Sequence, residues 1–193
     1  MWWFAGCASV DPPSAPDTGA WADLGSGPTE EEPRHARPAA TGEATPPAVA
    51  LPGVGPIRVY AVRHAEKGEG EDPSLTEEGE ARAQALADLL SGVPLDAVYA
   101  TDLARTQETV QPTADQHALP VITRFDPYEE LAMHILGVHR GDTVLHAGHS
   151  YTLPSFFSAL GVEDPPEVDG YGQIWTLDVS DEGVAWSEAH FGE

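Results

Sequence analysis

Arginine and histidine side chains follow three short apolar stretches of the sequence. The residues are Arg63 and His64 after IRVYAV, Arg105 beyond AVYA, and His149 after TVLHAG. An arginine fork matches the paired oxygens of a phosphate. A neutral imidazole between two arginines resists protonation, because nearby positive charge disfavours its cationic form, and one ring nitrogen stays available for attack. These residue types predict a phosphoryl-transfer site that needs no metal.

Strand and helix patterns alternate from Pro56 onward. The expected strands cover residues 57–62, 97–100, 121–125 and 143–147, and a hairpin joins residues 173–179 to 184–189,. The expected helices follow an N-cap at Thr76, begin again near Leu103 and bend or end at Pro112, and then cover residues 129–138 and 151–160,. Such alternation predicts an α/β fold with a mostly parallel sheet, helices on both faces and an antiparallel edge strand.

The carboxyl ends of the expected parallel strands bring the polar residues together. In open parallel sheets, ligands bind beyond these ends. Thr101 and Asp102 follow the second expected strand, so a hydroxyl group joins the arginines and histidines. In isolation, Arg63 or Arg105 would more simply pair with one of the many surface carboxylates. Their position at strand ends beside histidines favours a functional site instead.

Four blocks of the sequence, in this order, resemble the histidine phosphatase superfamily, also called the phosphoglycerate mutase-like family. They are RHAEK, LTEEG, VYATDLARTQET and TVLHAGHS, and the similarity spans roughly residues 57–180. The likeness is to small bacterial members of the phosphohistidine phosphatase type. It implies a three-layer α/β/α sandwich and a reaction in which His64 is phosphorylated and then hydrolysed. The residues that it implies for holding the phosphoryl group are Arg63, Arg105, His149 and Thr101.

The general acid is the member of the site that the sequence leaves open. Larger relatives carry a glutamate after the third strand, and this chain offers Asp126, Glu129 and Glu130 there, with Glu66 as a further alternative. Asp126 lies nearest the expected strand end and is our choice. Without a carboxylate near the leaving oxygen, only substrates with good leaving groups would turn over well.

The resemblance implies a hydrolase that acts on a phosphorylated small molecule or a phosphoprotein and needs no cofactor. The alternative is a domain of the same fold that binds a phosphoryl group with little or no turnover. A metal site made by His64, His149 and a carboxylate is disfavoured, because two arginines would repel a cation. His146 alternates with apolar neighbours in an expected strand, so we expect a hydrogen-bonded core histidine there.

The net charge of the chain excludes some partners. Its 193 residues include 9 Lys and Arg against 32 Asp and Glu, which gives a formal charge of −23. A field of this sign repels nucleic acid and anionic lipid, so neither is expected as a main partner. Such acidity is typical of proteins adapted to a salty medium, where counterions screen the self-repulsion.

The first 55 residues differ in composition from the rest of the chain. Residues 10–55 are rich in Pro, Ala, Gly, Thr and Glu without a helical or strand period, which predicts a disordered tether before a folded domain at 56–193,. FAGC near the start resembles the lipid-attachment box of bacterial lipoproteins, but the basic and apolar parts of a secretory signal are missing before Cys7,. A start upstream of residue 1 would predict an extracytoplasmic protein tethered to the membrane through lipidated Cys7. Otherwise we expect a cytoplasmic protein.

Overall fold

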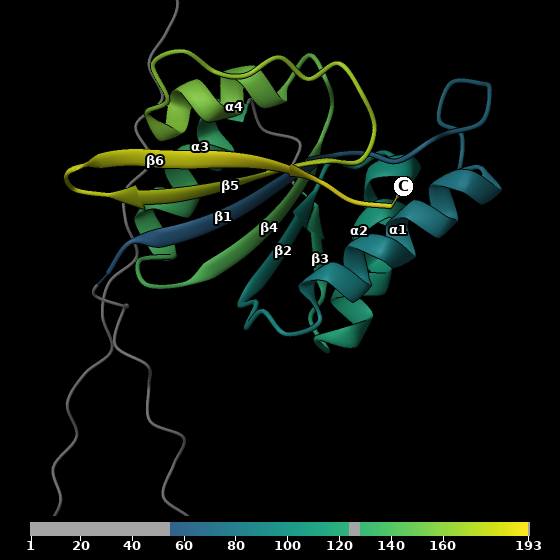
Figure 1. Ribbon diagram of the computed structural model, residues 1–193, viewed down its shortest axis with the longest axis horizontal. Coiled ribbons are helices and arrows are strands. Elements are labelled where there is room, and N and C mark those ends of the chain that lie inside the picture. The colour runs from purple at the N-terminus through teal and green to yellow at the C-terminus, as the bar shows by residue number, and fades with distance from the viewer. Residues whose placement is uncertain (1–54, 124–127, 193) are drawn as a thin grey trace, which may run out of the picture. The chain divides into compact units, whose positions relative to one another are not determined.

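The centre of the fold is a mixed β-sheet (Figure 1). A computed structural model describes residues 55–123 and 128–192. The strands of this part of the chain are β1 (Ile57–Arg63), β2 (Ala97–Ala100), β3 (Val121–Thr123), β4 (Thr143–Gly148), β5 (Gln173–Ser180) and β6 (Gly183–His190). They lie in the order β3-β2-β4-β1-β5-β6, and β3, β2, β4 and β1 pair in parallel. The expectation of a mostly parallel sheet is confirmed.

Two pairs of helices cover the two faces of the sheet (Figure 1). They are α1 (Glu77–Leu90) with α2 (Ala104–Gln116), and α3 (Tyr128–Val138) with α4 (Leu153–Leu160). Neighbouring residues of β2 show how the faces are divided, since successive strand side chains point to opposite faces. Val98 packs in the cluster that includes α1 and α2 side chains, whereas Tyr99 packs with those of α3 and α4. The three-layer α/β/α arrangement is thus confirmed.

The C-terminal hairpin supplies two antiparallel pairings at one side of the sheet. β5 pairs antiparallel with β1, and β6 pairs antiparallel with β5. Gly183 begins β6 with a φ of 133°, which is a conformation that residues with a side chain rarely adopt,. In the strand order, β5 is next to the edge of the sheet, and its hairpin partner β6 is the edge strand.

Two expectations about helix boundaries have different outcomes. Thr76 is the N-cap of α1, as predicted, and its hydroxyl oxygen accepts a hydrogen bond from the Gly79 N–H at 3.2 Å,. Pro112 does not end α2, and the helix continues past it. Proline removes one helical hydrogen bond, but Val110 and Ala114 are fully buried on either side of it. Their packing against the sheet holds the helix together across the proline.

Several expectations fall on residues that lie outside the described ranges. They concern the tether before residue 55, the lipid-attachment cysteine Cys7, the last two residues of the strand expected at 121–125, and the candidate acid Asp126. Within the ranges that are described, no helix is both long and apolar enough to cross a lipid bilayer.

Gly79 is a residue of α1 at which the backbone leaves no room for a side chain. A Cβ atom there would overlap the backbone carbonyl oxygen of Glu66 and lie 3.1 Å from the Glu66 nitrogen. We expect Gly79→Ala to lower the free energy of unfolding by about 1–3 kcal/mol, since only a backbone shift can relieve the overlap. Urea denaturation measures this loss.

Gly137→Ala is the matched control for Gly79→Ala. Gly137 also lies within a helix, α3, but no atom lies within 4 Å of its Cβ position. Alanine there should raise the free energy of unfolding by up to about 1 kcal/mol through its helix propensity. A Gly79→Ala variant as stable as the wild type would contradict the close approach of α1 to Glu66.

Candidate active site

Three adjacent strand ends place the predicted residues side by side. Arg63 is paired with Gly148 between β1 and β4, and Ala100 is paired with Ala147 between β2 and β4. The three ends are therefore level with one another at one edge of the sheet. The residues immediately beyond these ends are His64, Thr101 and His149.

The His64 ring is held in one tautomer. Its Nδ1 lies 2.8 Å from the Ala65 carbonyl oxygen, which can only accept a hydrogen bond,. Nδ1 therefore donates, and Nε2 carries the lone pair of the neutral ring. Burial of the ring lowers the pKa of His64 to about 4 against the opposing Ala65 hydrogen bond, and Arg63 and Arg105 lower the pKa further. At neutral pH, His64 thus presents an unprotonated nitrogen.

Thr109 connects the segment after His64 to the first turn of α2. The Ala65 N–H donates to Thr109 Oγ1 at 2.9 Å, and this hydroxyl donates to the Arg105 carbonyl oxygen at 2.6 Å. The Thr109 side chain is fully buried. One threonine therefore fixes the backbone beside the histidine relative to the backbone of an arginine.

Arg63 and Arg105 bring two guanidinium groups to the histidines. The Nε atoms of both are buried and have no hydrogen-bond partner among the described residues. Arg63 Cζ lies 4.3 Å from the centre of the Tyr171 ring. Arg105 Nη1 lies 3.7 Å from Asp72 Oδ1. Buried donors normally have an acceptor, so these arginines are not simple surface ion pairs, and a bound anion would supply acceptors to them.

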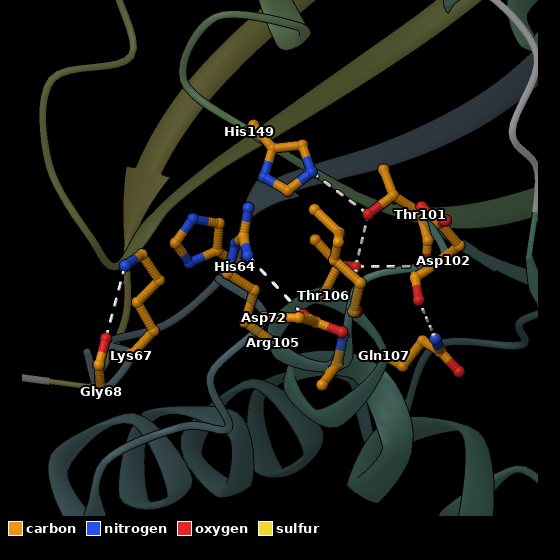
Figure 2. A network of polar contacts seen from close by, with 12 residues as sticks. His64, Lys67, Gly68, Asp72, Thr101, Asp102, Arg105, Thr106, Gln107 and His149 are labelled. Atoms are coloured by element: carbon orange, nitrogen blue, oxygen red, sulfur yellow. Dashed lines mark hydrogen bonds and ion pairs between the residues drawn. The ribbon is translucent and has the colours of Figure 1, made fainter. Parts of the chain in front are cut away.

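His149 lies beside His64 in the site (Figure 2). The two ring centres are 5.3 Å apart, and the His149 ring stacks on that of Tyr151 at 5.2 Å. Burial lowers the pKa of His149 to about 4, and the charges of His64 and Arg105 lower it further. Both imidazoles are therefore neutral at pH 7, and the positive charge beside them belongs to the arginines.

Thr101 lies beside His149, and its contact with a phosphoryl group stays a prediction. Its Oγ1 lies 3.1 Å from His149 Nε2 and 2.7 Å from Thr106 Oγ1 (Figure 2). A hydroxyl group has a single hydrogen to donate, and both of these neighbours already lie within hydrogen-bond distance. In this arrangement the Thr101 hydroxyl group contacts a second hydroxyl group and an imidazole.

The structure removes one candidate for the general acid. Both carboxylate oxygens of Glu66 accept from Arg82 Nε, at 2.8 and 2.9 Å. Burial raises the pKa of Glu66, but Arg82 outweighs this and holds the pKa below its usual value. Glu66 is therefore ionised at neutral pH and is wrong as a proton donor. Glu129 and Glu130 are exposed in the first turn of α3.

Some residues near the site carried no signal in the sequence. Asp72 accepts from the first N–H of α2 at 2.9 Å. The Tyr171 ring, from the segment before β5, lies 5.8 Å from the His64 ring. Each is distant in sequence from the residue that it contacts, so no local pattern could indicate the pair. The residues that share a sequence block with Arg105, and so had a signal, are Thr106 and Thr109.

His146 lies in the core, as expected, but without the expected hydrogen bonds. Its ring centre lies 4.6 Å from that of Phe156, a residue of α4. Among the described residues, neither ring nitrogen makes a hydrogen bond of ordinary geometry, although the Tyr99 backbone weakly favours the charged form. Burial dominates and lowers the pKa of His146 to about 3, and His149 lowers it further. A hydrogen-bonded ring was the wrong expectation, because His146 packs against an apolar helix.

We expect His146→Leu to make the fold less sensitive to acid. The folded protein keeps His146 neutral down to about pH 3, whereas the unfolded chain binds a proton there below about pH 6.5. Stability therefore falls as the pH drops below 6.5, by up to about 1.4 kcal/mol per pH unit for this group. Leucine removes that proton uptake together with two unpartnered nitrogens.

Urea denaturation between pH 7 and pH 4 tests this effect of His146. The free energy of unfolding of the leucine variant should decline less steeply with falling pH than that of the wild type. His190→Leu, at an exposed position in β6, is the control and should keep the wild-type slope. Identical slopes for His146→Leu and the wild type would show that His146 is not a buried neutral group.

A family model matches the part of the chain that includes Arg63 and His64. Residues 59–127 match the model of the histidine phosphatase superfamily (branch 1). The matched range includes three of the residues that meet in the site, Arg63, His64 and Arg105. No curated protein matches the sequence.

Solved structures share the fold at low sequence identity. The protein histidine phosphatase SixA in complex with tungstate is 16% identical, with a TM-score of 0.61, over 69% of this chain and 96% of that chain. A mycobacterial glucosyl-3-phosphoglycerate phosphatase is 13% identical, with a TM-score of 0.56, over 70% and 98%. YhfR of Bacillus stearothermophilus is 19% identical, with a TM-score of 0.56, over 67% and 94%. The chain thus shares the fold of these proteins, and its residues 59–127 are similar to the histidine phosphatase superfamily (branch 1).

Proposed function

We propose that the chain is a phosphatase that hydrolyses a phosphate monoester or a phosphohistidine through a phosphohistidine intermediate on His64. One observation carries the proposal. The bare Nε2 of His64 lies in a site where Arg63 and Arg105 each have a buried donor without an acceptor among the described residues. A nucleophile beside two unsatisfied cationic donors suits the transfer of a dianionic group.

The reaction has two steps on this site. In the first, His64 Nε2 attacks phosphorus, the N–P bond forms, and the bond to the leaving group breaks. In the second, water attacks the phosphohistidine, the N–P bond breaks, and inorganic phosphate leaves with His64 restored. Arg63 and Arg105 stabilise the phosphoryl oxygens in both steps, and His149 contacts the same group.

Glu66 is not expected to protonate the leaving group. Glu66 is ionised and bound to Arg82. The para-nitrophenolate group can leave without a proton, and the imidazole of a phosphohistidine can take its proton from solvent on the other ring nitrogen. The neighbours in fold include a protein histidine phosphatase and a glucosyl-3-phosphoglycerate phosphatase, which supports both a phosphoprotein and a phosphorylated small molecule as substrate classes.

The proposed reaction is independent of a metal ion. Two guanidinium groups beside His64 and His149 would repel a divalent cation. In residues 55–123 and 128–192, no group of three or more His, Cys, Asp or Glu side chains is arranged to hold a metal.

Hydrolysis of para-nitrophenyl phosphate by the full chain tests the proposal. Turnover in the presence of a chelator, at a rate unchanged by added divalent cations, is the expected result. Activity that disappears with the chelator and returns with a metal ion would contradict the proposed chemistry.

A second candidate function is a domain that binds phosphoryl groups with little turnover. The observation that favours it is the ion pair between Glu66 and Arg82, which leaves this carboxyl group unable to protonate a leaving oxygen. Binding of tungstate by a folded protein that does not hydrolyse para-nitrophenyl phosphate would support this function instead.

The pH dependence of the first step follows from the neutral state of His64. Because the pKa of His64 is lowered to about 4, its nucleophilic form persists well below pH 6.5. We expect kcat/KM for para-nitrophenyl phosphate not to decline between pH 7 and about pH 5, and to fall only as the pH passes through about 4. An acid limb centred near pH 6.5 would mean that His64 titrates like an exposed histidine.

A further inference from the structure

A chain of hydroxyl groups leads from the start of α2 to His149 (Figure 2). Thr106 Oγ1 lies 2.8 Å from the Leu103 carbonyl oxygen and 2.7 Å from Thr101 Oγ1. Thr101 Oγ1 in turn lies 3.1 Å from His149 Nε2. Each hydroxyl group has one hydrogen, so the position of one proton determines the next.

The Leu103 carbonyl oxygen, at one end of this series of hydroxyl groups, determines which group donates in each hydrogen bond. Thr106 Oγ1 lies 2.8 Å from the Leu103 carbonyl oxygen and 3.2 Å from the Thr101 carbonyl oxygen, and neither of these oxygens has a hydrogen, so Thr106 donates its single hydrogen to them, chiefly to the nearer Leu103 O,. The contact between the two hydroxyl groups then needs the hydrogen of Thr101. Thr101 has no hydrogen left for the imidazole, and the proton between them must belong to His149 Nε2.

We propose that Thr106, acting through Thr101, is a positioning residue that holds neutral His149 as its Nε2–H tautomer, so that His149 takes up a proton on Nδ1 when a dianionic phosphoryl group binds. The inference rests on the proposed function, because it requires a phosphoryl group beside His149. In the reverse direction Thr106 would donate to Thr101, and Thr101 would donate to His149 Nε2. That arrangement forms two hydrogen bonds in place of three, and it leaves the short contact between Thr106 Oγ1 and the Leu103 carbonyl oxygen without a proton.

The free nitrogen of His149 explains why a proton is needed. Nδ1 is buried, has no hydrogen-bond partner among the described residues, and lies on the side of the ring that faces His64 (Figure 2). A lone pair there would repel a phosphoryl oxygen, whereas an N–H donates to it. The protonated ring also keeps its Nε2 hydrogen bond to Thr101, so binding of a dianion disturbs neither hydroxyl group.

The groups around His149 disfavour protonation of its Nδ1 until an anion binds. The titratable and charged groups that face it are His64 and Arg63 at the end of β1, Arg105 in α2, His146 in β4, and Tyr151 before α4. Burial, and then the charges of His64, Arg105 and Arg63, lower the pKa of His149 to about 4. Near neutral pH the free protein therefore lacks the proton, and a bound dianion would raise the pKa by adding opposite charge and an acceptor. The proton comes from solvent and is returned when phosphate leaves.

Calorimetric titration of the full chain with tungstate at pH 7.5 measures the proton uptake. Tungstate is a dianion that does not itself titrate at this pH, so the heat in two buffers of different ionisation enthalpy gives the number of protons bound. We expect nearly one proton per tungstate in the wild type. In Thr106→Val the Thr101 hydroxyl is free to donate to Nε2, Nδ1 carries the hydrogen beforehand, and the uptake should fall below half a proton.

Two variants control for the loss of a buried hydroxyl group. Thr106→Ser keeps the donor and should keep the uptake of the wild type. Thr113→Val makes the same substitution at another fully buried position of α2, where the hydroxyl has no hydrogen-bond partner among the described residues. Its proton uptake should equal that of the wild type.

The nitrogen chemical shifts of His149 in the free wild-type protein test the tautomer without any variant. The inference expects a protonated Nε2 and a bare Nδ1, with Nδ1 becoming protonated after tungstate is added. A protonated Nδ1 in the free protein, or equal proton uptake in the wild type and folded Thr106→Val, would overturn it. Absence of tungstate binding would instead count against the proposed phosphoryl site, and the shifts of the free protein would still decide the tautomer.

Discussion

Replacing His64 by alanine is expected to lower the turnover of para-nitrophenyl phosphate by about 10³-fold or more. Loss of a covalent nucleophile commonly has effects of this size or larger. In the proposed reaction the bare Nε2 forms the bond to phosphorus, and the neutral state of the ring makes it available at pH 7. Initial rates with saturating substrate and chelator present measure the loss.

Tungstate binding separates the chemical role of His64 from a general loss of structure. Arg63 and Arg105 remain in His64→Ala, so the variant should still bind the oxyanion, within about tenfold of the wild-type affinity if the removed contact contributes about 1.4 kcal/mol. His190→Ala is the control for histidine removal, since that residue is exposed in β6. Turnover by His64→Ala within tenfold of the wild type would exclude His64 as the nucleophile.

Arg105→Lys is expected to reduce kcat/KM by about 10²–10³-fold although the charge is kept. Removal of one donor aimed at developing negative charge has effects of this size. Lysine lacks the planar fork that can hold two phosphoryl oxygens at once. The Arg105 side chain is only 11% exposed and has a buried Nε without an acceptor, so water could not easily take the place of the missing donors.

Arg140→Lys is the control for the arginine substitution. Arg140 is half exposed and pairs with Asp181 at 2.8 Å, and an ion pair of this kind contributes little. Its variant should keep the wild-type kcat/KM. An Arg105→Lys variant with activity within twofold of the wild type would show that a single positive charge is sufficient at that position.

The convergence of His64, Thr101, His149 and Arg105 could be predicted from the sequence. The apolar runs before His64, Thr101 and His149 are short and clear, and parallel strands bring their carboxyl ends to one edge,. Arg105 follows from the same logic, because it lies in the first turn of the helix after β2. Local pattern and strand direction together were enough to place these side chains.

Other features depend on contacts that no local pattern encodes. Tyr171 reaches Arg63 from a segment more than a hundred residues later in the chain. The direction of the Thr101 hydroxyl depends on Thr106 and on a carbonyl group of the turn between β2 and α2. The helix α2 continues past Pro112 because tertiary packing outweighs a local preference,. Such outcomes follow from three-dimensional neighbours and not from spacing in the sequence.

Detection of the phosphorylated enzyme tests the central claim most directly. The full chain would be mixed with para-nitrophenyl phosphate, quenched in alkali, in which a phosphoramidate survives, digested, and examined by mass spectrometry. The account predicts a phosphoryl group on the peptide that contains His64, formed and lost at rates that match turnover, and absent from His64→Ala. Turnover without a phosphoryl group on His64, or with one on a different residue, would contradict the account.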